Sequence, residues 1–219
     1  MGRPAAKARI RDARQALYQE HILDAAEEIF ARHGYEDAKV VSMATAAGVS
    51  LATVYRSFET KSDIYRAVHA RRLSGLSAQV HARLAAATGT LDKMLAGIAA
   101  YIAFHMEHPS YLRMHLRDGN AWSMSNTLQS PEQVQAWTEG LALITVAFRT
   151  GLAEGLYVDD ESADFLARTM IAMHQVRLAD WVERGMKESV DEITGAVHRQ
   201  FVRTFCVAKV ATRYLKTMA

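Results

Sequence analysis

The sequence has little of what interrupts helices, with three prolines and twelve glycines among 219 residues. It also lacks alternating runs of Val, Ile, Thr and Tyr, the pattern that is typical of half-buried strands. Long stretches rich in Ala, Leu, Met, Glu and Arg, which favour helices, stand in their place. Hydrophobic residues make up 50% of the chain, which is enough for a small domain beside a larger one. We therefore expect an all-α protein of about nine helices.

The chain has a single cysteine, Cys206, so it cannot form a disulfide within itself. Its first residues show no charged segment followed by an apolar segment and a small-residue cleavage site, which is the pattern of a secretory signal. The longest purely apolar stretches fall well below the roughly 18 residues that span a bilayer. These absences lead us to expect a cytoplasmic protein that does not enter a membrane.

The charge is nearly balanced over the whole chain, at a net +2, but it is uneven along it. Residues 1–72 carry twelve Lys and Arg against nine Asp and Glu, whereas residues 73–219 carry fourteen against fifteen. Within residues 1–16, Asp12 is the one acid beside five basic residues: Arg3, Lys7, Arg9, Arg11 and Arg14. Residues 1–17 are thus predicted to be a basic arm suited to a polyanion, with a merely solubilising tail as the alternative.

Capping and turn residues mark the ends of the predicted helices. Gly34 stands where a left-handed residue closes the first helix, and Thr60 with Asp63 has the spacing of a helix-capping pair. Pro109 and Pro131 suit first-turn positions. The predicted helices cover roughly residues 12–33, 41–47, 51–57, 61–86, 91–107, 109–117, 131–154, 161–186 and 189–215, and residues 119–130 are predicted to be a loop.

The most informative segment is residues 40–59, VVSMATAAGVSLATVYRSFE. Ala44 is small enough for two helices to cross, and Gly48 can turn the chain with a positive φ. Val54 then anchors the second helix, and Ser50 is placed to cap it. This spacing predicts a helix-turn-helix whose second helix can enter a DNA major groove with one outward face, made of Leu51, Thr53, Tyr55 and Arg56.

The run from about residue 22 to residue 68 resembles the DNA-binding domain of the TetR family of repressors. The matching residues are Phe30, Gly34, Tyr35, Ala44, residues 47–50 (Ala-Gly-Val-Ser), residues 53–58 (Thr-Val-Tyr-Arg-Ser-Phe), Lys61 and Ile64. The resemblance implies that Tyr55 and Lys61 hold phosphates, whereas Leu51, Ala52, Thr53 and Arg56 face bases or the nearby backbone. Arg56 is the best candidate to contact a guanine. The candidate DNA-binding residues are therefore Ser50, Leu51, Ala52, Thr53, Tyr55, Arg56 and Lys61.

Two positions depart from the pattern of that family. Lys39 and Val40 stand where Thr or Ser usually precedes the second helix, and Ser57 stands where His is common. Without a capping hydroxyl, the second helix loses about 1 kcal/mol of local stability unless Ser42 or water substitutes.

We expect residues 18–66 to form the DNA-binding domain and residues 67–219 to form a larger domain for ligand binding and dimerisation. Within the latter, residues 164–182 and 193–210 show apolar arcs wider than a helix needs to cover one core. This width predicts that both helices pair with a second copy in a four-helix bundle, as the resemblance also implies. A central place for both helices in one monomeric core is the alternative.

A small hydrophobic or aromatic effector is expected in the C-terminal region, where aromatic and pliable side chains accompany few polar groups. Core packing uses the same residue types. His105 and His174 stand out because an imidazole on an apolar face needs a partner. The candidate ligand-binding residues are Tyr101, Phe104, His105, Met114, Trp122, Trp137, Met170, Met173 and His174.

Together these features predict a repressor that binds double-stranded DNA at a palindromic site as a homodimer. The effector would release it, with the helix of residues 61–86 acting as the lever.

Two other classes compete with this interpretation. An all-helical metalloenzyme could use His105, His108 and His115, or the acids of residues 159–164, but neither set has the spacing of a metal site. We therefore expect no catalytic residue, metal or cofactor. A helical adaptor that binds proteins and does not use its DNA-binding head is the second alternative, and affinity for random duplex that falls steeply with salt would separate the two.

Overall fold

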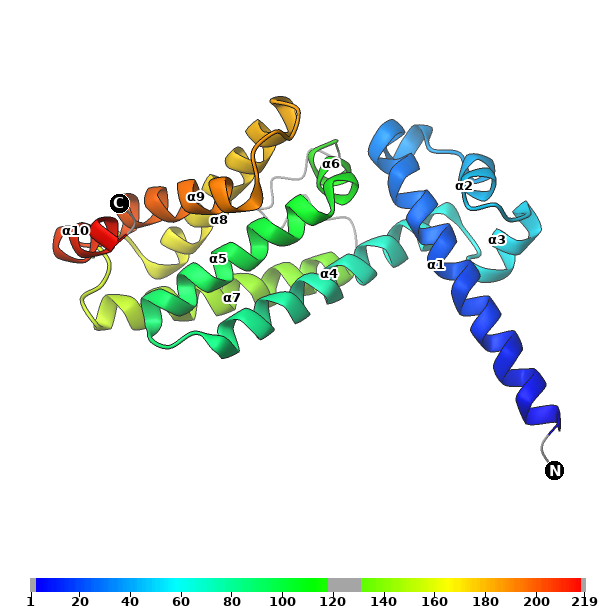
Figure 1. Cartoon of the computed structure of the whole chain (residues 1–219), viewed down its shortest axis with the longest axis horizontal. Coiled ribbons are helices and arrows are strands. Elements are labelled where there is room, and N and C mark those ends of the chain that lie inside the picture. Colours follow the sequence, from blue (N-terminus) through cyan, green and yellow to red (C-terminus); the bar gives the residue numbers. More distant parts are fainter. Residues whose placement is uncertain (1–2, 118–130, 218–219) are drawn as a thin grey trace. The chain divides into compact units, whose positions relative to one another are not determined.

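The computed structural model describes residues 3–117 and 131–217, without the side chains of residues 3–8, 10 and 132 (Figure 1). In chain order the helices are α1 (Arg3–Asp37), α2 (Val40–Ala46), α3 (Leu51–Ser57), α4 (Lys61–Ala86), α5 (Thr90–Glu107), α6 (Pro109–Arg117), α7 (Pro131–Ala153), α8 (Ala163–Glu183), α9 (Val190–Phe205) and α10 (Ala208–Thr217). The all-α prediction is confirmed, with ten helices in the described residues. The loop predicted over residues 119–130 lies outside them.

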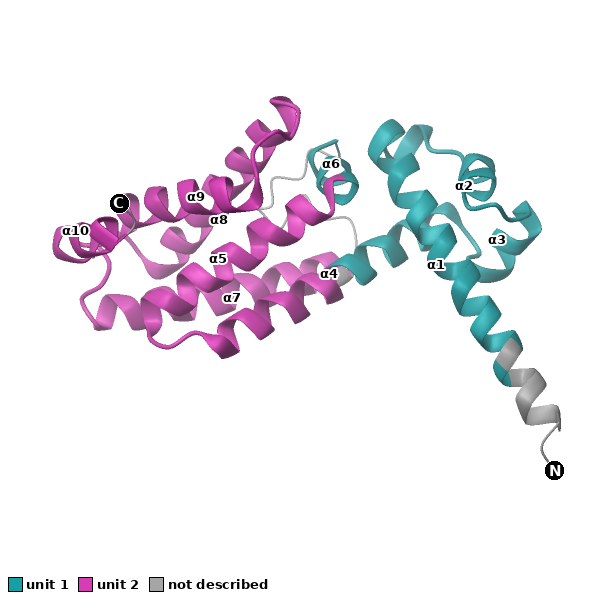
Figure 2. Cartoon of the chain, viewed as in Figure 1, with its two compact units in different colours: residues 1–72, 110–118 teal, residues 73–109, 119–219 magenta. Residues whose placement is uncertain are grey.

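The chain divides into two compact units (Figure 2). One unit comprises the residues up to 72 together with residues 110–118, and the other comprises residues 73–109 and 119–219. α6 therefore belongs to the first unit, and α4 contributes residues to both. The domain boundary that we predicted, between residues 66 and 67, falls within α4.

The first unit has its core along one face of α1. Ile22, Ala26, Ile29 and Phe30, which the sequence places on one helical face, are all buried. The Tyr65 ring of α4 packs edge-on against the Phe30 ring, with centroids 5.2 Å apart. Gly34 interrupts the helical backbone with φ 75°, as its position predicts.

The predicted basic arm is helical and continues α1 at its N-terminal end. α1 begins at Arg3, nine residues before the predicted start at Asp12. Residues 5–17 are rich in Ala, Arg, Leu and Gln, which favour a helix, and Pro4 suits the first turn. The Arg14 guanidinium donates to the Tyr18 hydroxyl at 2.9 Å within this stretch.

The second unit is built around α5, which packs against α7, α8 and α9. α5 is apolar nearly all round, with Ile98, Ala100, Ile102 and Phe104 among its buried side chains. A helix that is hydrophobic on every side belongs in an interior, and this one supplies the centre of its unit.

The last predicted helix, residues 189–215, is two helices, so that prediction was wrong. Cys206 lies between α9 and α10 with an extended backbone and pairs with Tyr157 in an isolated antiparallel bridge. The Val158 amide donates to the Phe205 carbonyl at 2.9 Å, and the Val207 amide donates to the Leu156 carbonyl at 3.0 Å. These bonds between distant parts of the chain replace the helical ones.

The wide apolar arc of α9 is used inside the chain itself. Ile193, Val197, Phe201, Val202 and Phe205 are all buried, so the width of this arc needs no second chain to explain it. α8 is different, because Phe165 and Val176 remain 53% and 71% exposed.

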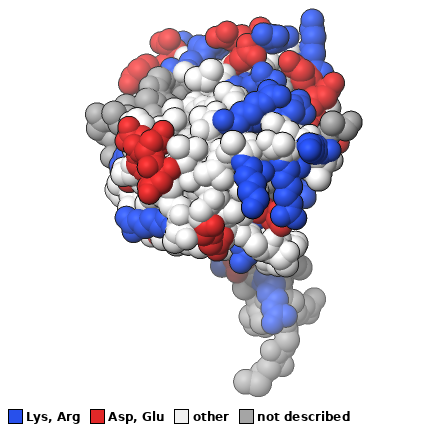
Figure 3. Space-filling model, turned by 90° about the vertical axis from the view of Figure 1, so that its left-hand side faces the viewer, with Lys and Arg blue, Asp and Glu red and all other residues white. Residues whose placement is uncertain are grey.

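α10 packs against α9 but buries none of its side chains. Its basic residues Lys209, Arg213 and Lys216 are exposed. In the view of Figure 3, Lys and Arg side chains gather on one part of the surface, and Asp and Glu side chains lie on other parts of it.

Candidate DNA-binding interface

α2 and α3 form the helix-turn-helix that the sequence predicts. Ala44 and Val54 are buried, and Gly48 turns the chain with φ 66°. A Cβ on Gly48 would meet no atom within 4 Å, so this position needs glycine for its backbone conformation and not for space. Val49, which follows this turn, is half-buried.

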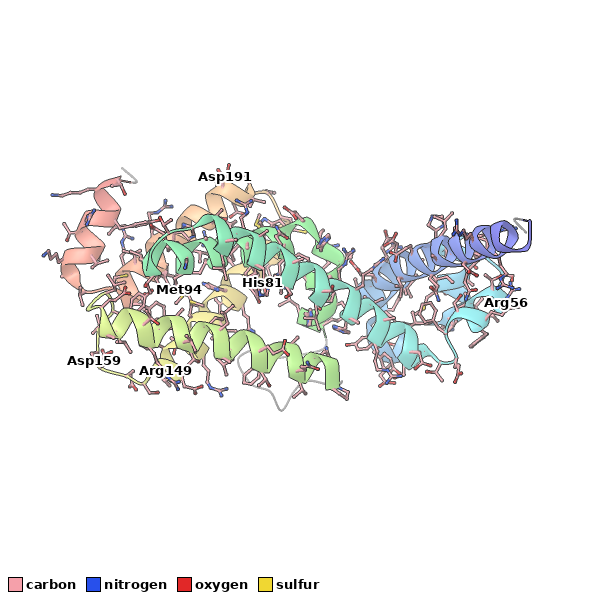
Figure 4. The ribbon with its side chains drawn as sticks, turned by 90° about the horizontal axis from the view of Figure 1, so that it is seen from below. Arg56, His81, Met94, Arg149, Asp159 and Asp191 are labelled. Atoms are coloured by element: carbon pink, nitrogen blue, oxygen red, sulfur yellow. The ribbon has the colours of Figure 1, made fainter. Side chains whose placement is uncertain are left out.

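Ser50 caps α3, as predicted. Its Oγ accepts a hydrogen bond from the Thr53 amide at 3.1 Å and lies 2.8 Å from the Thr53 Oγ1. The Arg56 Nη2 donates to the same Thr53 Oγ1 at 2.9 Å. The three polar side chains thus form a continuous hydrogen-bonded chain on α3, from which Arg56 projects (Figure 4).

The side of α3 that carries these residues is open to solvent. Leu51 is 38% exposed and Tyr55 is 50% exposed, whereas Val54 on the opposite side is fully buried. Ala52 and Arg56 are exposed as well, and Thr53 is half-buried. The structure therefore brings together on one surface all the candidate DNA-binding residues of α3.

The missing cap of α2 is confirmed. The Lys39 side chain makes no capping hydrogen bond, and the Lys39 carbonyl accepts from the amides of Ser42 and Met43 at 3.0 and 3.3 Å. The start of α2 therefore depends on its packing against α1 and α3.

Lys61, the expected phosphate ligand, also has a role inside the domain. Its ammonium donates to the Tyr35 carbonyl at 2.6 Å and to the Glu36 carbonyl at 2.9 Å. It lies 4.6 Å from the centroid of the Tyr35 ring. Because an ammonium has three donors, one remains after these two bonds.

The capping pair at the start of α4 forms as predicted. The Thr60 amide donates to Asp63 Oδ2 at 2.9 Å, and the Asp63 amide donates to Thr60 Oγ1 at 3.1 Å. The side-chain hydrogen bond from Thr60, followed by the one from Arg66, lowers the pKa of the Asp63 carboxyl.

An ion cluster that sequence reasoning missed joins α1 to α4 behind the helix-turn-helix. Glu27 is 4% exposed and takes two hydrogen bonds from Arg72, at 2.7 and 3.1 Å. Arg71 reaches Glu27 at 3.3 Å and also pairs with Glu20 and Asp24. An acid directly beside the buried Ala26 was the signal that could have indicated this cluster.

Beside it, α6 closes the first unit with a group of buried aromatic side chains. The His69 Nδ1 lies 3.3 Å from the Tyr111 hydroxyl, and the His115 ring lies 5.0 Å from the His69 ring. Burial lowers the pKa of His69 to about 4, so the ring is neutral. Met114, a predicted ligand residue, is buried in this unit, whereas the other described ligand candidates belong to the second unit.

In the second unit the structure brings three of the ligand candidates together. The Tyr101 ring lies 4.3 Å from the His105 ring and 5.9 Å from the His174 ring, between centroids. His105 Nδ1 lies 2.8 Å from the Tyr101 carbonyl, so this nitrogen carries the proton. Burial lowers the pKa of His105 to about 4 and of His174 to about 3.

The other ligand candidates differ in how deeply they are buried. Phe104 and Met170 are buried, and Met173 is half-buried. Trp137 is half-buried beneath the Arg168 guanidinium, 5.0 Å from the ring centroid. Trp122 lies outside the described residues.

In the described ranges, no three residues among His, Cys, Asp and Glu are grouped so as to hold a metal ion. Across the same ranges, none of the helices combines the length and the apolar character that crossing a membrane requires.

Comparison with known proteins supports the interpretation of α1 to α4. Residues 22–68 match the model of the bacterial regulatory proteins of the tetR family. Residues 22–68 thus resemble the family's helix-turn-helix domain, and the comparisons support a TetR-type transcriptional regulator. This match agrees with the DNA-binding regulator that the sequence predicts.

Relatives of the chain include both an activator and a repressor. The chain is 34% identical over 89 residues to the transcriptional activator FasR of Mycolicibacterium smegmatis, a match that covers 41% of this chain and 40% of FasR. It is 24% identical over 152 residues to the transcriptional repressor SCO4008 of Streptomyces coelicolor, covering 69% of this chain and 73% of that protein. The match with FasR thus spans less than half of its length.

The fold resembles that of solved TetR-like regulators. FadR of Bacillus subtilis, solved in complex with stearoyl-CoA, superposes with a TM-score of 0.66 at 17% identity, over 83% of this chain and 96% of FadR. At this identity the likeness shows a common fold alone.

Proposed function

We propose that this chain is a repressor that binds a palindromic DNA site as a homodimer and is released by a small apolar or aromatic effector. The exposed side of α3 is the observation that carries the proposal. Ser50, Thr53 and Arg56 form a hydrogen-bonded chain there, and Tyr55 is half exposed on the same helix. A helix of this size fits the major groove, where forked and short side chains reach base edges.

Within this proposal the residues of α3 and α4 have distinct roles. Tyr55 and Lys61 hold phosphates and set the register on the backbone, since a hydroxyl and an ammonium suit phosphate oxygens. Leu51, Ala52, Thr53 and Arg56 face bases or the nearby backbone, with Ser50 as the cap that holds the first turn. The basic residues of α1 add attraction to the polyanion.

The small size of α3, the helix proposed to contact bases, favours a homodimer that presents two copies of it to DNA. Two copies of α3 related by a twofold axis would meet successive major-groove faces about 34 Å apart, or a multiple of that distance. The exposed Phe165 and Val176 of α8 support α8 as the centre of the pairing surface, because exposed large apolar side chains on one helix favour a partner. α9 would take part through its remaining outer side.

Residues 18–66 are then the DNA-binding domain, and residues 67–219 bind the effector and the second copy. α4 contributes to both compact units, which supports it as the lever of induction. The effector must bind more tightly to a conformer whose two copies of α3 are wrongly spaced for DNA.

Selection of bound sequences from random duplexes with the purified full chain tests this proposal. A palindromic consensus is expected, and affinity for random duplex should fall steeply as salt rises. No binding at low salt would contradict the proposal and favour an adaptor. A reporter gene placed behind the selected site then distinguishes repression, which we expect, from activation.

A further inference from the structure

The interior of the second unit contains polar atoms on α8 that no group among the described residues satisfies. His174 is 3% exposed, and its Nε2 is buried without a hydrogen-bond partner. The Nε of Arg177 is also buried without a partner. Buried polar atoms are almost always paired, so two orphaned nitrogens on one helix call for a specific explanation.

The two side chains lie on the same side of α8. They are three residues apart, which makes them neighbours on a helix surface. The Tyr101 ring of α5 lies 5.9 Å from the His174 ring, and Met170, one turn earlier on α8, is 3% exposed. The His174 ring therefore lies beside an aromatic side chain, and Arg177 follows it on the same side of α8.

A third orphaned polar atom comes from α9, which packs against α8. Thr194 Oγ1 is buried without a partner. It lies one turn before His198, which acts electrostatically on His174. α9 thus packs on α8 with His198 close enough to His174 to act on its charge.

The chemistry of these groups selects the ligand. The guanidinium of Arg177 is a cation, and its Nε is a donor only. The neutral His174 ring can supply a second N–H. A half-buried guanidinium whose Nε has no partner favours an anionic acceptor, and a carboxylate both accepts from such donors and balances the charge. A hydroxyl or an ester can accept a hydrogen bond but leaves the charge unbalanced.

We propose that the effector is an organic carboxylate, held at its acid group by Arg177 and His174, with its apolar body against Tyr101 and Met170. The inference rests on the proposed function in that it names the chemical class of the effector.

Matched probes test the inference on the full chain. Naphthoate is compared with naphthol and methyl naphthoate, and decanoate with decanol and methyl decanoate, by the shift in melting temperature over a range of probe concentration. We expect at least one acid to bind about tenfold more tightly than its alcohol and ester, as a charge-assisted hydrogen bond provides. If neither acid exceeds its neutral counterparts, or no probe binds, the inference is overturned.

Variants then locate the acid group. Arg177→Gln should abolish the preference for the acid and leave the affinity for the alcohol unchanged, whereas Arg177→Lys should retain part of the preference. Arg149→Gln, at an exposed position of α7 (Figure 4), is the matched control and should keep the preference intact. An acid preference that survives Arg177→Gln would overturn the assignment.

DNA binding measured without any probe keeps this test separate from that of the proposed function. DNA binding together with no acid preference would refute the effector class and leave the regulator standing. Acid preference without DNA binding would refute the proposed regulator and leave the carboxylate site standing.

Discussion

The Lys61 ammonium donates a hydrogen bond of 2.6 Å to the Tyr35 carbonyl and lies against the Tyr35 ring. A residue expected to hold a DNA phosphate thus also ties the start of α4 to the end of α1. The hydrogen bonds to the Tyr35 and Glu36 carbonyls fix the position of the ammonium and therefore the direction of its third N–H.

Lys61→Ala should therefore have two effects. Loss of the charge-assisted bonds should lower the free energy of unfolding by about 1–3 kcal/mol. Affinity should fall for all DNA sequences alike, and the slope of affinity against salt should decrease by about 1. Lys39→Ala, at an exposed position without a capping bond, is the control for stability. An unchanged salt slope would show that Lys61 has only the internal role.

Arg56→Ala should relax the choice of one base pair, at a cost of about 1–3 kcal/mol for the preferred sequence. The bond to Thr53 orients the guanidinium, so Thr53→Val should reproduce part of the effect. Sequence selection with each variant measures this. Arg32→Ala, at an exposed position of α1, should leave the selected sequence unchanged. A uniform loss over all sequences on Arg56→Ala would contradict a base contact.

Glu27→Gln should destabilise the first unit by roughly 2–3 kcal/mol, because Arg71 and Arg72 would lose their shared buried carboxylate. The expected loss of stability is smaller than for a fully buried ion pair because each arginine side chain remains about one fifth exposed. The neighbouring exposed pair provides the control: Glu28→Gln breaks only its bond to Arg32 and should cost about 0.3–0.5 kcal/mol. Urea denaturation measures the free energy of unfolding of both variants. Equal losses would contradict a larger contribution from the buried carboxylate than from the exposed one.

Gly151→Ala should destabilise the second unit by about 1–3 kcal/mol. A Cβ at this position would lie 2.1 Å from Cε2 of the buried Tyr157 ring. Gly140→Ala in the same helix meets no atom within 4 Å and should instead stabilise by about 0.5–1 kcal/mol. Opposite signs in thermal unfolding are the expected result, and a neutral Gly151→Ala would contradict close packing of α7 against Tyr157.

The stability of the fold should fall as the pH is lowered from about 6.5 to 4. Burial lowers the pKa of His69 and His105 to about 4 and that of His174 to about 3. Between these values and the ordinary 6.5, the unfolded chain binds protons that the folded chain does not, so unfolding is favoured. Each ring contributes at most about 1.4 kcal/mol per pH unit.

Urea denaturation at several pH values between 7.5 and 4 measures this loss. His69→Gln should flatten the dependence by removing one titrating ring, and His33→Gln on the exposed surface should not. A stability that is level across this range would contradict the burial of neutral histidines.

Several features of the fold and the site could be predicted because their signals are local. Ser50 caps α3, Thr60 and Asp63 cap α4, and Gly48 has a positive φ, each as its position in the sequence indicates. Caps and turns depend on residues within one helical turn of each other, so a short stretch of sequence contains all the partners.

Other features could not be predicted because their partners are far apart in the chain. The break between α9 and α10 at Cys206 depends on its bridge to Tyr157, and the role of Lys61 depends on Tyr35. The same holds for the apolar arc of α9, whose width we attributed to a second copy. Hydrophobic periodicity indicates that a face is buried, but not against which partner.

The sequence by itself determined the helical class, the helix-turn-helix and the outward face of α3, because helix periodicity, capping and turn formation act between near neighbours. Only the tertiary structure decided that Glu27 bridges two arginines, that α6 packs with the first unit, and that His174 and Arg177 keep unsatisfied nitrogens. Burial and long-range pairing set these outcomes, and both depend on which helices come to lie side by side.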